Sequence, residues 1–169
     1  MRVGLIGQVR RVWAPRGVKV RQKVEFKYEW EYLNLVVNGL EGTLYWEWTP
    51  NMKAEEIAKV VEQWQAKDIE IIVWDRAPGH RGKDVKRVGV KLIEQPPYSP
   101  ELNPAERVFE ELRRKVEGKV YGGMDKKKAA IERELQQLAA DPEKVKSLAG
   151  WTWIQQTVDS LSNPIMALH

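Results

Sequence analysis

Two carboxylates, Asp75 and Glu106, stand where a strand end and a helix start could bring them together. Asp75 follows the apolar run 69–74, which predicts a strand buried on both faces, and ligand sites in open α/β sheets form at this end of the strands. Glu106 lies in the first turn of a helix predicted to begin at Asn103-Pro104, on the flank of its apolar face. Their spacing of 31 positions leaves room for one short strand and a proline-rich loop. Each residue also has a structural explanation, because Asp is frequent in turns and Glu can complete a capping box here.

Carboxylates that converge in this way are typical of a divalent-metal site. Mg²⁺ prefers oxygen ligands and keeps waters that can meet a substrate phosphate. Two metal ions about 3.5–4 Å apart can activate a water and stabilise the leaving oxygen in phosphodiester cleavage. If they converge, Asp75 and Glu106 are candidate metal-binding and catalytic residues for a site holding Mg²⁺ or Mn²⁺, in a two-metal arrangement, and the structural explanation of each residue stays open at this point. The chain has no cysteine and two histidines, which excludes disulfides, thiol catalysis and metal sites built on cysteine or a histidine cluster.

Positive charge is concentrated in two segments of the chain. Residues 1–23 carry seven Lys or Arg and no acid, and residues 71–93 carry six against two acids, within a net charge of +4. A basic surface attracts polyanions because binding releases their counterions. The alternative is that both segments are solvated basic loops. The candidate DNA-binding residues are Arg10, Arg11, Arg16, Lys19, His80 and Arg81.

The order of the predicted elements indicates an α/β fold, with a mixed β-sheet flanked by helices. The predicted strands cover 3–6, 32–37, 43–48, 69–74 and 90–93; the predicted helices run from near 53, from 103 to 116, from a cap at Asp125 to about 140, and from 152 to 161. A turn is predicted at Ala14-Pro15-Arg16-Gly17. No stretch approaches the ~20 apolar residues of a membrane span, and the first residues lack a signal-peptide layout.

Three motifs, in this order along the chain, resemble those of mariner-type transposases and their bacterial insertion-sequence relatives. Residues 13–17 are similar to the Trp-Ala-Pro-Arg-Gly turn of that superfamily, and residues 75–80, Asp-Arg-Ala-Pro-Gly-His, to its Asp-Asn-Ala-x-x-His signature. Residues 96–106 read Pro-Pro-Tyr-Ser-Pro-Glu-Leu-Asn-Pro-Ala-Glu and resemble the Pro-Pro-Tyr-Ser-Pro-Asp-Leu-Asn-Pro-Ile-Glu signature. The eleven-residue match is the most specific, and the motifs cover roughly residues 1–117.

The resemblance implies an RNase H-like DDE endonuclease domain that cuts and joins DNA with three acidic residues and divalent metal. By motif, Asp75 matches the second catalytic carboxylate and Glu106 the third, whereas Glu101 matches an acid that is not catalytic. His80 matches the motif histidine, which is either a phosphate or loop contact or a structural turn residue. Arg76 replaces the usual Asn, and the interval between the two carboxylates is a few residues shorter than in the commonest members.

The resemblance also implies partners and a domain arrangement. The expected partner is DNA, both transposon ends and target, with no membrane and no small-molecule cofactor; a homodimer is left open. We expect a cytoplasmic, nucleoid-associated protein that takes part in the transposition of a mobile element. Residues 1–120 are expected to form the catalytic core, and residues 121–169 a helical extension of the same domain.

The first acid of the family's triad is the largest departure from the pattern. In the family it lies on the first strand, just before the segment that residues 1–6 match, and this chain has no Asp before Asp68. We therefore expect a catalytic core truncated at its N-terminus, with weak metal binding and little or no DNA cleavage. One alternative is a non-catalytic nucleic-acid-binding or assembly protein derived from a transposase. Another is an unrelated metal-dependent nuclease using Asp75 and Glu106, which the proline-rich motif disfavours.

Overall fold

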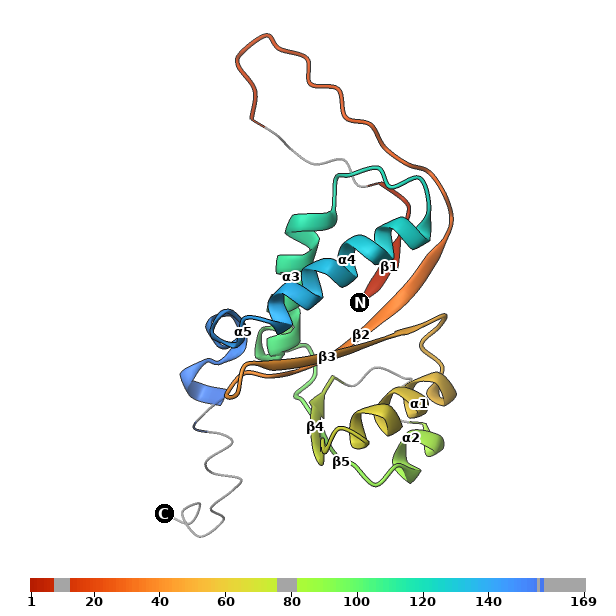
Figure 1. Cartoon of the computed structure of the whole chain (residues 1–169), viewed down its shortest axis with the longest axis vertical. Coiled ribbons are helices and arrows are strands. Elements are labelled where there is room, and N and C mark those ends of the chain that lie inside the picture. Colours follow the sequence, from red (N-terminus) through yellow and green to blue (C-terminus); the bar gives the residue numbers. More distant parts are fainter. Residues whose placement is uncertain (8–12, 76–81, 155, 157–169) are drawn as a thin grey trace.

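The strands β2 and β3 cross the middle of the molecule and separate two groups of elements (Figure 1). The computed structural model describes residues 1–7, 13–75, 82–154 and 156. The elements are β1 (Arg2–Gly4), β2 (Trp30–Asn38), β3 (Thr43–Thr49), α1 (Ala54–Gln65), β4 (Ile71–Trp74), α2 (Lys83–Arg87), β5 (Lys91–Glu94), the 3₁₀ turn η2 (Pro100–Leu102), α3 (Pro104–Val116), α4 (Met124–Ala139) and α5 (Pro142–Ala149). Helices α3, α4 and α5 lie on one side of β2–β3, and α1, α2, β4 and β5 lie on the other (Figure 1).

The described strands are hydrogen-bonded as two sheets. β1, β2 and β3 form an antiparallel sheet with β2 in the middle, and β4 pairs with β5 in parallel. The turn between β2 and β3 is held by the side chain of Asn38, which accepts hydrogen bonds from the backbone N–H of Leu40 (3.0 Å) and of Glu41 (3.2 Å). The predicted α/β class, with both antiparallel and parallel strand pairing, is confirmed.

Two hydrophobic cores lie on opposite faces of β2 and β3, because successive side chains of a strand point to opposite faces. The first core is built by β1–β3 with α3, α4 and α5, and contains Leu33, Leu44, Val108, Leu112, Ile131, Leu135 and Val145. The second core is built by α1, β4 and α2, and contains Ile57, Val61, Trp64, Ile72, Trp74 and Val85. Leu35 of β2 packs against the first core, whereas its neighbour Val36 packs against the second. The central sheet is therefore shared by both cores.

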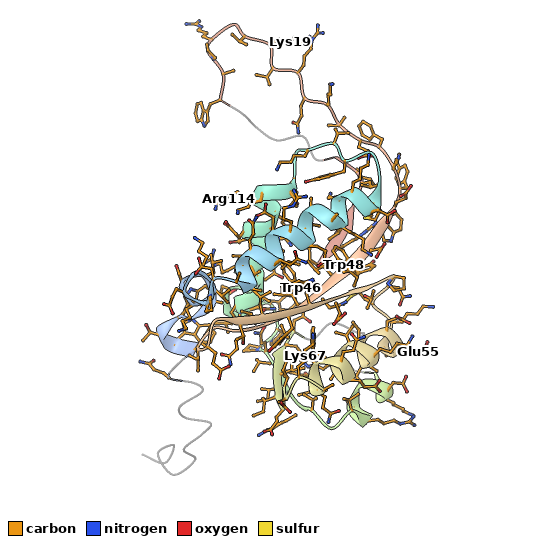
Figure 2. The ribbon with its side chains drawn as sticks, in the orientation of Figure 1. Lys19, Trp46, Trp48, Glu55, Lys67 and Arg114 are labelled. Carbon is orange, nitrogen blue, oxygen red and sulfur yellow. The ribbon has the colours of Figure 1, made fainter. Side chains whose placement is uncertain are left out.

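One carboxylate ties α4 to β3. The two oxygens of Glu132 accept hydrogen bonds from the indole N–H groups of Trp46 (2.9 Å) and Trp48 (2.5 Å). Both tryptophans lie on the part of β3 that passes next to α4 (Figure 2). The ammonium group of Lys128 adds a cation–π contact, 4.9 Å from the ring centroid of Trp48. Polar contacts thus supplement hydrophobic packing between this helix and the sheet.

The prediction that the strand before Asp75 is buried on both faces is wrong. In β4, Ile72 and Trp74 are buried in the second core, but Ile71 and Val73 are 48% and 52% exposed. The β4–β5 pair therefore packs through one face only. A run that is apolar apart from Glu70 does not distinguish this arrangement from two-sided burial, because its composition is the same in both cases.

The helices largely follow the predicted pattern, with three differences. Met124 begins α4 after Gly123, so Asp125 lies in the first turn and does not cap it. Helices α2 and α5 were not predicted; the side chain of Asp141 caps α5 by accepting from the N–H of Lys144 at 3.0 Å. Residues 152–154 and 156 are helical, and the rest of the helix predicted for 152–161 lies outside the described residues.

No helix in the described ranges is long and apolar enough to span a membrane.

A long arm, residues 13–29, projects from the body between β1 and β2 (Figure 1). The predicted turn near its start is confirmed, because the N–H of Val18 donates to the carbonyl of Pro15 (3.1 Å) and Gly17 has a φ of +86°. The end of the arm is anchored by two backbone hydrogen bonds, from Leu5 N–H to Glu29 O (3.0 Å) and from Gly7 N–H to Glu25 O (2.7 Å). The arm thus leaves and re-enters the body next to β1.

Candidate active site

Asp75 is placed by the parallel pair of strands. It is the first residue after β4, it is exposed, and the preceding carbonyl, that of Trp74, accepts a hydrogen bond from Gln95 N–H at 2.8 Å. The ladder between β4 and β5 therefore continues up to the position of Asp75. The structure places this carboxylate at the carboxyl end of a parallel strand pair, the edge at which open α/β sheets form ligand sites.

Glu106 is placed by the start of α3. As predicted, Asn103 is the N-cap and Pro104 the first helical residue; the Asn103 side chain accepts from the N–H of Ala105 at 3.0 Å. The carboxylate of Glu106 lies 3.7 Å from the guanidinium of Arg113, two turns further along the helix, and its side chain is 39% exposed. It is engaged in an ion pair with Arg113 and stands at the edge of the helix, where solvent reaches it.

The amino group of Met1 is influenced electrostatically by both carboxylates. It donates a hydrogen bond to the carbonyl of Leu33 at 2.6 Å. Burial lowers the pKa of this group to about 6; Glu106 raises it, Arg113 lowers it and Asp75 raises it. Both carboxylates are therefore near enough to the start of β1 to influence the charge of this amino group. Sequence reasoning missed this amino group and Arg113, although the seven-residue spacing from Glu106 to Arg113 already places both on one side of a helix.

The described residues offer few ligands to a divalent cation near Asp75 and Glu106. No group of three Asp, Glu or His side chains in the described ranges is arranged to hold a metal ion. The oxygen chemistry of Asp75 and Glu106 suits Mg²⁺ or Mn²⁺, but two carboxylates leave most of an octahedral shell to other ligands. The positive charge of Arg113 beside Glu106 also opposes a cation here. The described residues therefore supply the oxygen ligands that a divalent cation prefers, but too few of them to fill its coordination shell.

The candidate DNA-binding residues fall into two groups. Arg16 and Lys19 lie on the arm, are exposed, and are separated from the helices; Lys19 is near the far end of the arm (Figure 2). Arg10, Arg11, His80 and Arg81 lie outside the described residues. The structure therefore places the described candidates on a projecting segment and not beside Asp75 or Glu106.

A cavity of about 300 Å³ borders β1, and its lining residues include neither Asp75 nor Glu106. Lys127 lines it and donates from Nζ to the carbonyl of Gly4 at 2.5 Å. Burial lowers the pKa of Lys127, while Glu117 and Glu25 raise it. The hydrogen bond from Lys127 to Gly4 therefore links α4 to β1 at the edge of this cavity.

The comparison with protein families identifies the class of this domain. The family model described as DDE superfamily endonuclease matches residues 1–123, so the chain belongs to the DDE superfamily endonucleases. No curated protein matches the sequence closely enough to count as a relative.

Solved transposase structures share the fold. The Mos1 transposase paired-end complex with the left transposon end is similar at a TM-score of 0.58 and 15% identity, over 87% of this chain and 52% of that chain. The Mos1 strand transfer complex is similar at 0.59 and 14% identity, over 89% and 53%. The Mos1 mariner paired-end complex with Mn gives 0.59 and 14%, over 89% and 54%. The chain thus spans about half the length of these transposases and has the RNase H-like fold that the sequence predicts.

Proposed function

We propose that this chain is the catalytic core of a DNA transposase, which cuts and joins DNA at transposon ends and target sites by hydrolysis and transesterification of phosphodiesters. The observation that carries this proposal is the match of residues 1–123 to the DDE superfamily endonucleases, and it is supported by Asp75 at the carboxyl end of β4 and Glu106 in the first turn of α3. The Mos1 structures of similar fold are complexes with transposon ends or strand transfer complexes, which supports DNA as the partner. On this proposal the protein acts on nucleoid DNA in the cytoplasm.

Metal binding by this chain is proposed to be weak. Asp75 and Glu106 would supply two oxygen ligands, and a divalent cation held by them would act as a Lewis acid on a phosphodiester. Arg113 is proposed to hold the Glu106 carboxylate in place through the 3.7 Å ion pair. The cations of the arm are proposed to hold the DNA backbone, because the arm from residue 13 to residue 24 carries Lys and Arg and no acid.

Calorimetric titration with Mn²⁺, together with nicking of supercoiled plasmid, tests this function. We expect weak Mn²⁺ binding that is lost in both Asp75→Asn and Glu106→Gln, with little or no nicking by the unmodified chain. Glu110→Gln is the matched control, because Glu110 is an exposed carboxylate on the same helix that pairs with Arg107 at 2.9 Å. Unchanged Mn²⁺ affinity in both site variants would overturn the assignment. Strong nicking abolished by Asp75→Ala would show that another residue completes the site and that metal binding is not weak.

A second candidate function is DNA binding without cleavage, by a protein derived from a transposase. It is favoured by the incomplete set of acidic ligands in the described ranges. This function predicts DNA affinity that is the same with and without Mn²⁺ and that does not change in Asp75→Asn. Metal-dependent nicking at any Mn²⁺ concentration would exclude it.

A further inference from the structure

Three aromatic side chains are exposed at every second residue where the arm runs into β2. Phe26 is 71% exposed, Tyr28 81% and Trp30 41%; we refer to these three residues as the aromatic strip. Aromatic side chains gain strongly from burial, since each can cover about 150–250 Å². Three of them exposed in sequence on one segment form a surface that is expected to have a binding partner.

The aromatic strip is held in place by the residues that alternate with it. The Glu25 carboxylate accepts hydrogen bonds from the backbone N–H groups of Tyr121 (3.3 Å) and Gly122 (3.2 Å). The ammonium group of Lys27 donates to the carbonyl of Gly122 at 2.9 Å. Beyond them, the carbonyl of Glu29 accepts from Leu5 N–H at 3.0 Å. The backbone of this segment is therefore fixed against the body, so a ligand of the strip would meet a preorganised surface.

The spacing of the strip suits a nucleobase. Alternate residues of an extended chain are about 6.6–7 Å apart, which is roughly twice the 3.4 Å rise between stacked bases. One planar base can therefore lie between successive rings in van der Waals contact with both. Trp30 already presents a ring face to a planar group, because the guanidinium of Arg2 lies 4.2 Å from its ring centroid. Ring faces offered at this spacing are characteristic of stacking platforms for single-stranded nucleic acids.

The charge of the adjoining arm is complementary to a phosphate backbone. The arm leads into the strip with exposed Arg16, Lys19, Arg21 and Lys23, and residues 13–24 contain no acid. Base pairs in a duplex are stacked on each other, so their faces are closed to the strip, whereas an unpaired strand offers both faces and phosphates.

We propose that the aromatic strip and the arm bind single-stranded DNA, with bases stacked on Phe26, Tyr28 and Trp30 and phosphates held by the arm cations. The proposal rests on the proposed function only in taking DNA as the polyanion. It assigns a place for an unpaired DNA strand on this domain, separate from Asp75 and Glu106.

Fluorescence anisotropy with labelled dT20, and with a 20-base-pair duplex, tests this proposal on the full chain. We expect Phe26→Ala and Tyr28→Ala each to weaken dT20 binding by about 5- to 150-fold, which corresponds to roughly 1–3 kcal/mol per stacked base. Duplex affinity should change less than about twofold, and Tyr28→Trp should retain dT20 binding. Lys19→Gln with Arg21→Gln should instead weaken both DNAs and lower the salt slope by about 1 per charge removed. Ile71→Ala, an exposed apolar position on β4, is the control and should leave both affinities unchanged.

Three outcomes would overturn the proposal. The first is an unchanged dT20 affinity in both Phe26→Ala and Tyr28→Ala, and the second is that these variants lose equal affinity for dT20 and for the duplex. The third is that these variants lose self-association, measured by sedimentation, but still bind dT20, which would make the strip a contact between copies of the chain. Circular dichroism of the variants verifies that they fold. Failure of the proposed function would be recognised in a different experiment, because Mn²⁺ binding would then be insensitive to Asp75→Asn. The dT20 results would still stand in that case.

Discussion

Removing the Glu132 carboxylate should loosen α4 from the central sheet. This side chain is half-buried and accepts two indole N–H groups at once, from Trp46 and Trp48. Glu132→Ala leaves both donors without their partner, whereas Glu132→Gln keeps one acceptor oxygen for one of them. Glu132→Ala therefore removes two hydrogen bonds and Glu132→Gln removes one, and neither alters the hydrophobic core.

The expected loss follows from the number and kind of hydrogen bonds. A hydrogen bond to a charged group contributes about 1.5–3 kcal/mol, and water can replace part of it at a half-buried site. Taking the lower value for each indole, we expect Glu132→Ala to lower the free energy of unfolding by about 3 kcal/mol and Glu132→Gln by about 1.5 kcal/mol. For a chain of this length, 1 kcal/mol corresponds to about 2–4 °C, so the melting temperature of Glu132→Ala should fall by roughly 6–12 °C.

Urea denaturation followed by far-ultraviolet circular dichroism measures these differences without relying on tryptophan fluorescence, which the variants themselves would change. Glu134→Ala is the matched control on the same helix, because Glu134 forms a surface ion pair with Lys115 at 2.8 Å. Such pairs contribute about 0–1 kcal/mol. If Glu132→Ala destabilised the protein no more than Glu134→Ala, the two indole hydrogen bonds would not hold α4 to the sheet.

Three further predictions concern the β2–β3 turn, the amino terminus and the basic arm. Gly42 has a φ of +76°, and a Cβ atom there would lie 2.3 Å from the carbonyl oxygen of Pro142, so Gly42→Ala should cost at least about 2 kcal/mol in urea denaturation. Gly17→Ala, with a φ of +86° and open space around it, should cost only about 1 kcal/mol, and equal losses would contradict the close approach of the turn to α5. The pKa of the Met1 amino group is lowered from 8.0 to about 6, so the unfolded chain binds more protons between these values and stability should rise by up to about 3 kcal/mol from pH 6 to pH 8. Acetylating that amino group should abolish this rise in pH-dependent urea titrations, and a rise that persists would locate its cause elsewhere. Neutralising Arg10, Arg11 and Arg16 together should weaken duplex DNA binding uniformly across sequences and lower the salt slope by about 3, whereas an unchanged slope would show that these charges are merely solvated.

The local signals in the sequence predicted the elements that carry the two carboxylates. Asn103-Pro104 marks the start of α3 because an Asn cap and a proline at the first helical position are both favourable at the N-terminus of a helix. The same signal occurs at Asp141-Pro142, but α5 is only eight residues long, too short to show a convincing apolar periodicity. Helix α2, with five residues and one buried side chain, Val85, carries still less of a pattern.

How the elements pack against each other was harder to predict from the sequence. The sequence predicted that Asp75 and Glu106 lie at the ends of their elements. It did not predict that both carboxylates influence the Met1 amino group, because the position of this group depends on how β1 pairs with β2. The one-sided packing of β4 depends likewise on which layers cover it, and Ile71 and Val73 have the same side chains whether or not a layer is present. The projection of the arm follows from the contacts of Glu25 and Lys27 with Gly122, nearly a hundred residues away, for which no local signal exists.

The two hydrophobic cores have a consequence for how mutations reach the candidate site. Asp75 follows β4, which belongs to the second core, whereas Glu106 lies on α3, which belongs to the first. Their mutual distance is therefore set by how the two halves of the molecule dock through β2 and β3, and it is a property of neither half alone. Proteins open in cooperative units that differ in stability, and each core with its own helices has the makeup of such a unit. A substitution deep in the second core, such as Val85→Ala, would let one carboxylate drift relative to the other while the first core stays folded. The geometry of the candidate site would then be lost at temperatures where most of the protein remains native, through residues that touch neither carboxylate.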